Sequence, residues 1–474
     1  MFRRVTAYVV FCVEVFLGTD GRAELRDDAL AAAKKAATFY SRQVATKGGY
    51  LWRYSADLTL REGEGNVTGT TVWVQPPGTP AVGEAYVKLY DATSEPLFLD
   101  AAGAAAEALR RGQLRSGGWN DHIDFDPADR TRTPYRLDPP GAKKRTPSSL
   151  DDDKTQSAIR FLAQLDRSLE FKDEAVHEMT LFALDGLLGA QYPNGGFPQV
   201  WDEPHRPEDF PVMPAGYPRD WPRMYPGHGS YWFRYTLNDD LVPDVIHALF
   251  LAEAVYGGPR YRQAVLKAAD FLLLAQLPDP QPAWAQQYDF EMHPAWARKF
   301  EPPAVTGGES QGVLRILLEV YRRTGERKYL EPVPRAVAYL KKSLLPDGRL
   351  ARFYELQSNR PLYFTKDYTL TYNDSDLPTH YGFKVASKLD EIEKEYEALS
   401  AGDKQTTATK PGRVTRGMED RARAAIEGLD DRGAWVTEDK LRYQAYVGPI
   451  IDMSVAVKNL NVLADYLAAT IAGS

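Results

Sequence analysis

Apolar residues along this chain recur three or four positions apart, in segments that alternate with short turns containing glycine. Spacing of this kind is typical of amphipathic α-helices that bury one face. The segments come in neighbouring pairs, and many of them end at Gln or Gly, where helices commonly stop. The pattern predicts helices at 28–45, 82–92, 97–113, 155–169, 173–191, 240–256, 261–276, 309–324, 330–345 and 388–399.

The turns that follow these helices are similar to one another. The fullest version runs from Gln191 to Trp201 and reads Gln-Tyr-Pro-Asn-Gly-Gly-Phe-Pro-Gln-Val-Trp, and shorter versions lie at 113–119, 48–52 and 346–349. Self-similarity at an interval of several dozen residues indicates stacked supersecondary units, here helix hairpins. We therefore predict an all-α chain folded as an α/α toroid, in which inner and outer helices alternate around an axis. A linear solenoid is the alternative.

Three long connections, at 121–149, 203–236 and 277–306, are rich in Pro, charged and aromatic residues. Loops of this length are commonly functional, so we expect them to gather on one face of the toroid and to form a cleft. Alternating side chains predict a short strand at 352–356. The segment 400–417 is rich in Lys, Thr and Gly, which predicts a mobile insertion.

The beginning of the chain has the pattern of a secretory signal peptide. Met1-Phe2-Arg3-Arg4 is basic, the run 5–18 is mostly apolar but too short for a stable membrane anchor, and small residues follow near Ala23. We predict a leader at 1–23 and a secreted or periplasmic protein. The sole cysteine, Cys12, lies in this leader, so the mature chain would contain no disulfide.

The rest of the chain predicts one toroid domain over 24–474, and we expect it to be a monomer. Residues 24–120 would form extra hairpins at its N-terminal side. The net charge of −7 and the lack of a basic stripe argue against nucleic acid as a partner, and no later segment is apolar enough to cross a membrane. The 9 Trp and 27 Tyr suit a carbohydrate or apolar ligand, although core packing is the more common explanation for any single ring.

Acidic residues cluster at two predicted helix starts. Asp151-Asp152-Asp153 precedes the helix at 155–169, and Asn238-Asp239-Asp240 opens the helix at 240–256. One aspartate at such a position is explained by capping of free backbone amides. Additional carboxylates exceed that need, and calcium accepts oxygen ligands from separate loops in irregular geometry. The clusters are therefore candidate calcium ligands.

Cations flanked by aromatic residues mark two further segments. The first is Trp-Ala-Arg-Lys-Phe-Glu-Pro-Pro at 296–303, and the second is Arg-Phe-Tyr-Glu-Leu-Gln-Ser-Asn-Arg-Pro at 352–361, which continues to Lys366-Asp367. Surface cations are common without any function. Arginine nevertheless binds a carboxylate bidentately and aromatic faces stack on sugars, so these segments are suited to a carboxylate-bearing sugar.

Together, the Gln-Tyr-Pro-Asn-Gly-Gly-Phe-Pro-Gln turn, the Asn-Asp-Asp helix start and the two cationic segments resemble the family 10 pectate lyases, over 149–370 and in the family's order. The resemblance implies an α/α toroid that cleaves polygalacturonate, an acidic polysaccharide, by calcium-assisted β-elimination. In such a reaction the cation stabilises the carbanion-like transition state and a base removes the C5 proton. In this family the base is an arginine.

The resemblance also assigns roles to individual residues. It implies calcium ligands at Asp151, Asp239 and Asp152, although the family usually has Asn at the last of these positions. The family's arginine base aligns with Lys366, a departure from the pattern, and Arg360 is the second candidate. A lysine can act as the base if burial and neighbouring cations lower its pKa. Substrate contacts are expected from Arg298, Arg352, Trp296, Asn238 and Asp240.

Three other functions remain open from the sequence. Triterpene cyclases are toroids with similar Gln-to-Trp turns, and Leu150 to Asp153 imitates their acid motif, but the Arg-rich loops do not suit an isoprenoid cavity. An inverting glycosidase would use two separated carboxylates and would release saturated sugars. A non-catalytic uronate-binding protein would keep the acidic and aromatic loops without the base, which the departure at Lys366 allows.

Overall fold

The fold was analysed in a computed structural model that describes residues 13–128, 134–139, 147–204, 210–402 and 414–472. The predicted leader at 1–23 lies partly outside this range, including Cys12, and residues 13–23 belong to the first helix. Most of the predicted insertion at 400–417 also lies outside the described residues. Within them, no helix combines the length and the apolar character that crossing a membrane requires.

Twelve α-helices account for most of the regular structure in the described ranges. Their bounds are α1 Val13–Phe39, α2 Thr79–Thr93, α3 Pro96–Gly112, α4 Lys154–Ser168, α5 Glu174–Gly189, α6 Leu241–Tyr256, α7 Pro259–Ala275, α8 Glu309–Thr324, α9 Val333–Lys342, α10 Leu389–Ser400, α11 Arg416–Glu427 and α12 Met453–Ala472. All ten helices predicted from apolar spacing are present, and α8 has the predicted bounds. Nine of them agree to within a few residues, but the first, predicted at 28–45, begins much earlier, at Val13, and ends at Phe39.

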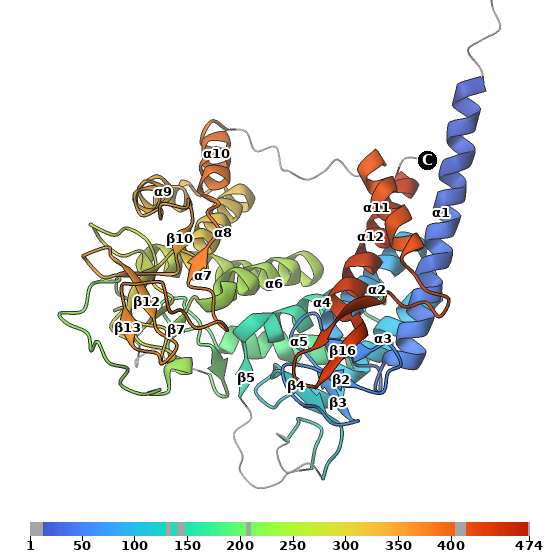
Figure 1. Cartoon of the computed structure of the whole chain (residues 1–474), viewed down its shortest axis with the longest axis horizontal. Coiled ribbons are helices and arrows are strands. Elements are labelled where there is room, and N and C mark those ends of the chain that lie inside the picture. Colours follow the sequence, from blue (N-terminus) through green and yellow to red (C-terminus); the bar gives the residue numbers. More distant parts are fainter. Residues whose placement is uncertain (1–12, 129–133, 140–146, 205–209, 403–413, 473–474) are drawn as a thin grey trace, which may run out of the picture.

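The helices form two layers. An inner row runs from α12 through α2, α4, α6 and α8 to α10, each helix packing on the next. Helices α3, α5, α7, α9 and α11 pack outside their hairpin partners or between them. The row curves into an arc, and α10 and α11 stand apart at its two ends (Figure 1). This alternation of inner and outer helices is the predicted α/α toroid.

The C-terminal helix α12 belongs to the inner row, where it packs against α2. The last part of the chain therefore extends the toroid and does not lie outside it. The regular elements of this region were not predicted, namely α11, α12 and the antiparallel hairpin of β15 (Thr437–Leu441) and β16 (Tyr446–Asp452). The hairpin joins β1 (Arg53–Ser55) and β2 (Arg61–Glu62) in one sheet, so that the two ends of the chain interlock.

Short strands tie the connections together at the helix ends. A second four-stranded sheet has the order β13-β12-β11-β9 and includes the predicted strand near 352–356, which is β11. The remaining strands form antiparallel pairs, β3 with β4, β5 with β6, β7 with β8 and β10 with β14. Their bounds are β3 Thr71–Trp73, β4 His122–Asp124, β5 Ser148–Ser149, β6 Val200–Trp201, β7 Tyr235–Thr236, β8 Gln287–Tyr288, β9 Ala304–Thr306, β10 Leu350–Ala351, β11 Phe353–Glu355, β12 Pro361–Phe364, β13 Leu370–Thr371 and β14 Lys384–Val385.

The repeated turns join neighbouring outer helices. The Nε2 group of Gln113 donates to the carbonyl of Gly117 in its own turn (2.9 Å) and to that of Met179 in α5 (3.0 Å). Gln191 does the same with Gly195 (3.1 Å) and with Ala264 in α7 (3.0 Å). Each amide thus satisfies backbone acceptors that a helix end leaves open. The glutamines of the repeat are therefore structural.

Glycine is required in these turns for two reasons. Gly195 has a φ of +95°, a conformation that other residues rarely adopt. A Cβ at this position would also lie 1.9 Å from the carbonyl oxygen of Lys267. The turn therefore packs against the next outer helix at backbone distance, which explains why the Gly-Gly pair recurs along the chain.

Candidate active site

Two helix starts with the same geometry present the acidic residues. A short 3-10 turn, Asp151–Asp153, leads into α4, and the turn Asn238–Asp240 leads into α6. The middle residue of each turn is left-handed, with φ and ψ of 49° and 41° at Asp152 and of 50° and 44° at Asp239. Because α4 and α6 are neighbours in the inner row, the two turns lie side by side.

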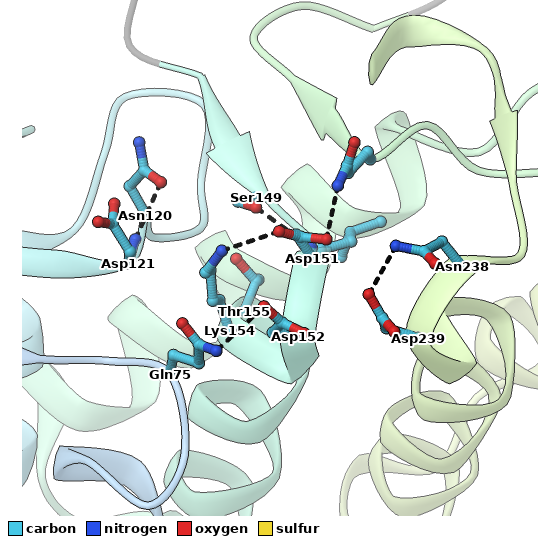
Figure 2. A network of polar contacts seen from close by, with 12 residues as sticks. Gln75, Asn120, Asp121, Ser149, Asp151, Asp152, Lys154, Thr155, Asn238 and Asp239 are labelled. Atoms are coloured by element: carbon cyan, nitrogen blue, oxygen red, sulfur yellow. Dashed lines mark hydrogen bonds and ion pairs between the residues drawn. The ribbon is translucent and has the colours of Figure 1, made fainter. Parts of the chain in front are cut away.

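Three aspartates converge between these turns. One carboxylate oxygen from each of Asp151, Asp152 and Asp239 lies within 4.8 Å of the other two. These are the three residues that the sequence assigned to a metal. Figure 2 shows their side chains facing one another across the gap between the two turns.

Each carboxylate accepts a hydrogen bond from an amide side chain, which comes from a distant loop for Asp151 and Asp152 and from the preceding residue for Asp239. Gln199 Nε2 donates to Asp151 Oδ1 (2.5 Å), Gln75 Nε2 to Asp152 Oδ2 (3.0 Å) and Asn238 Nδ2 to Asp239 Oδ2 (2.6 Å). A donor on one oxygen fixes the carboxylate plane. At Asp152 and Asp239 it leaves the other oxygen for a ligand, whereas the other oxygen of Asp151, Oδ2, lies 3.2 Å from Lys154 Nζ. The amides therefore hold the three carboxylates in place despite their mutual repulsion.

Negative charge is concentrated enough in this cluster to change its protonation. The pKa of Asp239 is raised to about 7, first because surrounding protein reduces its hydration and then because of Glu309, Asp152 and Asp151. The pKa of Asp152 is also raised, by burial and by Asp151. The three carboxylates therefore carry more negative charge than their surroundings balance, and a divalent cation would offset it.

Acceptor atoms around the cluster also fit a hard cation. Asn238 and Glu309 are each 6% exposed, and Asn238 Oδ1 and Glu309 Oε2 are buried without a hydrogen-bond partner among the described residues. Buried acceptors of this kind are rare unless water or an ion completes them. An all-oxygen donor set of carboxylates and an amide is the set that calcium prefers. The residues present thus fit the cation that the family resemblance implies.

Two of the predicted substrate contacts form a cationic wall beside the acidic cluster. Arg298 donates from Nε (2.8 Å) and Nη2 (2.5 Å) to the carboxylate of Glu301, which is 2% exposed. Arg352 donates from Nη1 to Glu309 Oε1 (3.2 Å). The pKa of both arginines is raised despite burial, because each faces a buried glutamate. Both therefore stay charged, as binding of a uronate carboxylate requires.

Aromatic rings complete this wall. Arg352 lies over Tyr381 at 4.6 Å from the ring centroid, and Arg298 lies over Phe300 at 5.0 Å. Tyr381 OH donates to Glu301 Oε1 (3.0 Å). Tyr381 therefore joins the two arginine–glutamate pairs, and no sequence pattern had indicated it.

Trp296 is not part of the open site. Its side chain is 5% exposed and packs against Trp221 and Tyr225, and its Nε1 donates to the carbonyl of Pro222 (2.9 Å). The predicted sugar-stacking role therefore has no exposed ring face in this structure, because the ring belongs to the core beneath the loop. Asp240 points toward α8, where a Cβ on Gly312 would lie 2.0 Å from its Oδ1.

Neither candidate base is buried. The Lys366 side chain is 65% exposed and its Nζ lies 3.0 Å from Asp376 Oδ1. Arg360 is exposed and stacks on Tyr372, with its guanidinium carbon 3.4 Å from the ring centroid. A lysine base was expected to be buried among other cations. Lys366 does not meet this condition in this conformation. Lys366 instead forms an ion pair with a carboxylate at the surface.

Several residues of the site could not be identified from the sequence. Gln75 and Gln199 contact the aspartates from loops far away in the chain, and Lys154 Nζ lies 3.2 Å from Asp151 Oδ2. Only Lys154 carried a signal, as a cation directly after three acidic residues. Glu309 was considered a helix-start carboxylate, but its partner Arg352 and its effect on Asp239 place it at the site.

Comparison with known proteins adds a family to this geometry. The sequence profile of the family described as "Pectic acid lyase" matches residues 113–210, 212–320 and 314–448. No curated protein sequence matches the chain. Among solved structures, a family 10 polysaccharide lyase from Cellvibrio cellulosa is 20% identical and covers 68% of this chain and 97% of its own, with a TM-score of 0.46. A D-mannose isomerase is 15% identical over 97% of this chain and 99% of its own, also with a TM-score of 0.46.

Proposed function

This chain belongs to the pectic acid lyase family, and we propose that it is a calcium-dependent pectate lyase that cleaves polygalacturonate by β-elimination. Membership makes it a lyase that acts on polysaccharides. The cation, the substrate and the residue roles are the proposal. Export from the cytoplasm and a monomeric state belong to the same proposal.

The observation that carries this proposal is the position of the three aspartates next to two paired arginines. Asp151, Asp152 and Asp239 supply oxygen ligands for calcium, and Arg298 and Arg352 supply fixed positive charge for uronate carboxylates. A glycosidase of the inverting type needs separated carboxylates with a water between them. Carboxylates whose oxygens lie within 4.8 Å of one another suit a shared cation better.

The chemistry begins with the C5 hydrogen, which lies α to the uronate carboxylate and is weakly acidic. A bound calcium would withdraw charge from that carboxylate and thereby favour the carbanion-like transition state. Arg298 and Arg352 would hold the uronate in a single orientation, because their own positions are fixed by Glu301 and Glu309. Elimination then breaks the C4–O bond and leaves a C4–C5 double bond.

The proton acceptor is assigned to Lys366, at the position of the family's arginine, with Arg360 as the second candidate. Both lie on the segment around β12, which joins β11 in the sheet that carries Arg352 near its edge. As a base, Lys366 must separate from Asp376 and lose its proton. Mildly alkaline pH favours that form.

Ultraviolet absorbance tests the proposal directly. Purified protein with calcium is expected to release oligogalacturonides with an unsaturated end, which absorb in the ultraviolet, and a chelator is expected to abolish the signal. Asp239→Asn should do the same at any calcium concentration. Saturated products would instead support a hydrolase, and binding without products would support a non-catalytic uronate-binding protein. Absence of any ultraviolet product across several uronans would rule the lyase out.

A further inference from the structure

One cation, Lys154, lies inside the acidic cluster itself. It is the first residue of α4, and its side chain is only 9% exposed. Its Nζ lies 3.2 Å from Asp151 Oδ2, an oxygen of the proposed calcium site (Figure 2). A lysine at this depth, in contact with a metal-binding carboxylate, is unusual, because ammonium and calcium compete for the same oxygen.

The surroundings of Lys154 are acidic on the other side as well. The positive charge of Lys154 favours the ionised form of three further carboxylates, those of Asp152, Asp121 and Glu64. Glu64 comes from the N-terminal hairpins and Asp121 from the long loop before β4. The ammonium therefore has carboxylates available on both sides of its present position.

A charge balance shows what Lys154 changes. The three aspartates carry three negative charges when ionised, and the neighbouring cations Arg298 and Arg352 are each already paired with a buried glutamate. The three aspartates and Lys154 together have a net charge of −2, which a single divalent ion balances, and Asp121 and Glu64 add further negative charge nearby when ionised. Without Lys154, one negative charge would remain after the divalent ion binds. A uronate carboxylate would then be repelled.

We propose that Lys154 is an internal counter-ion of this site, which competes with the divalent cation for Asp151 and lowers the repulsion felt by an anionic substrate. This inference rests on the proposed function. It predicts opposite effects on two ligands when the charge is removed. Calcium should bind more tightly, because its competitor is absent, and oligogalacturonate should bind more weakly, because the loaded site is more negative.

The test is calorimetric titration of Lys154→Met, which keeps the length of the side chain and removes its charge. At an effective dielectric constant of about 20, removing a unit charge a few ångströms away should tighten calcium binding by at least about tenfold. Trigalacturonate, titrated at saturating calcium, should bind about two- to fivefold more weakly. In the presence of a chelator, the variant should have a lower melting temperature than the wild type, because the three aspartates have lost the positive charge of Lys154. Added calcium should restore the melting temperature.

Two control variants separate charge from structure. Lys154→Arg keeps the positive charge and should leave both affinities close to those of the wild type. Lys34→Met removes a lysine of another ion pair, with Glu95 at the start of α3, and should change neither affinity. A role in packing alone would make Lys154→Met less stable with and without calcium and would leave the calcium affinity unchanged.

The outcomes also separate this inference from the proposed function. If the wild type binds calcium and Asp239→Asn does not, but Lys154→Met binds no more tightly, the counter-ion role is wrong and the calcium site stands. If neither wild type nor Lys154→Met binds calcium, both proposals are wrong. Tighter calcium together with unchanged trigalacturonate affinity would also overturn the inference, since the two effects have one electrostatic cause.

Discussion

Asp152 and Asp239 do two things at once. Each adopts a left-handed backbone conformation at a helix start, and each directs its carboxylate into the shared cluster. Aspartate tolerates this conformation better than most residues, because its short side chain bonds locally. The conformation still costs on the order of 1 kcal/mol or more per residue, and such costs are typically kept at functional sites. The repeated turn thus links backbone geometry to the position of the acidic cluster.

The assignment of the base is decided by two single substitutions. Lys366→Ala should lower kcat by about 10²- to 10⁴-fold, the usual contribution of a general base, and should leave KM nearly unchanged. Arg360→Ala should raise KM more than it lowers kcat, because Arg360 presents a fixed charge above Tyr372. Both are measured by ultraviolet kinetics at saturating calcium.

The reverse pattern would move the base to Arg360. A natural control is Asp376→Asn, which removes the carboxylate that pairs with Lys366. If Lys366 is the base, this variant should raise kcat, because the ion pair between Lys366 and Asp376 no longer has to be broken before catalysis. An unchanged kcat would argue that Lys366 does not act as the base.

Helices α6 and α8 are joined by a histidine whose charge contributes to their packing. His247 on α6 lies between Asp244 and Glu319, with Nε2 2.9 Å from Glu319 Oε2, and these two carboxylates raise its pKa to about 9. A folded pKa above the unfolded value of about 6.5 stabilises the fold below pH 6.5. That contribution is lost as the pH rises through 9.

His247→Gln should therefore lower the free energy of unfolding by a few tenths of a kcal/mol to about 1 kcal/mol at pH 6, a range that allows for screening of a side chain 40% exposed. Above about pH 9 the variant and the wild type should be equally stable. Denaturant unfolding at several pH values measures the difference, and His228→Gln, a change at an exposed loop histidine, is the control. A difference that persists at pH 10 would show that packing, not charge, is responsible.

The elements that the sequence predicted are those that bury a continuous apolar stripe. Helix α8 fits this description and was predicted to the residue, whereas α11 buries only Ala422 and Ala425 and gives too weak a pattern. The cluster of Asp151, Asp152 and Asp239 was predicted from the family resemblance. The burial of Trp296 was not, because an aromatic residue in a loop has the same sequence signature whether it faces a sugar or the core.

The extra N-terminal hairpins are connected to the site. They precede residue 113, where the family match begins, yet Gln75 in this region holds Asp152 (3.0 Å). Helix α2 packs between α12 and α4, so it joins the C-terminal helix to the helix that begins at the acidic cluster. Buried apolar residues form one continuous cluster from Leu25 to Leu467. The hairpins are thus placed to influence cation binding, an arrangement that sequence separation concealed.

Two glycines on neighbouring helices test whether the chain unfolds as the single domain that we predict. A Cβ on Gly83 of α2 would lie 2.3–2.6 Å from the ring of Phe161 on α4, which is fully buried, so Gly83→Ala must separate the two helices. Overpacking of this kind costs about 1–3 kcal/mol. Gly103 of α3 has open space around its Cα, and Gly103→Ala should instead stabilise by about 0.5–1 kcal/mol, because glycine is unfavourable within a helix.

We expect each variant to unfold in one transition. The free energy of unfolding should fall for Gly83→Ala and rise for Gly103→Ala. Gly83→Ala should also weaken calcium binding, because α2 begins four residues after Gln75 and carries its loop with it. Gly103→Ala should leave calcium affinity unchanged. Two separate transitions, of which only the first responds to Gly83→Ala, would show instead that the N-terminal hairpins fold independently. In that case calcium affinity should also be insensitive to Gly83→Ala, since a separately folding segment could not hold Asp152 in place.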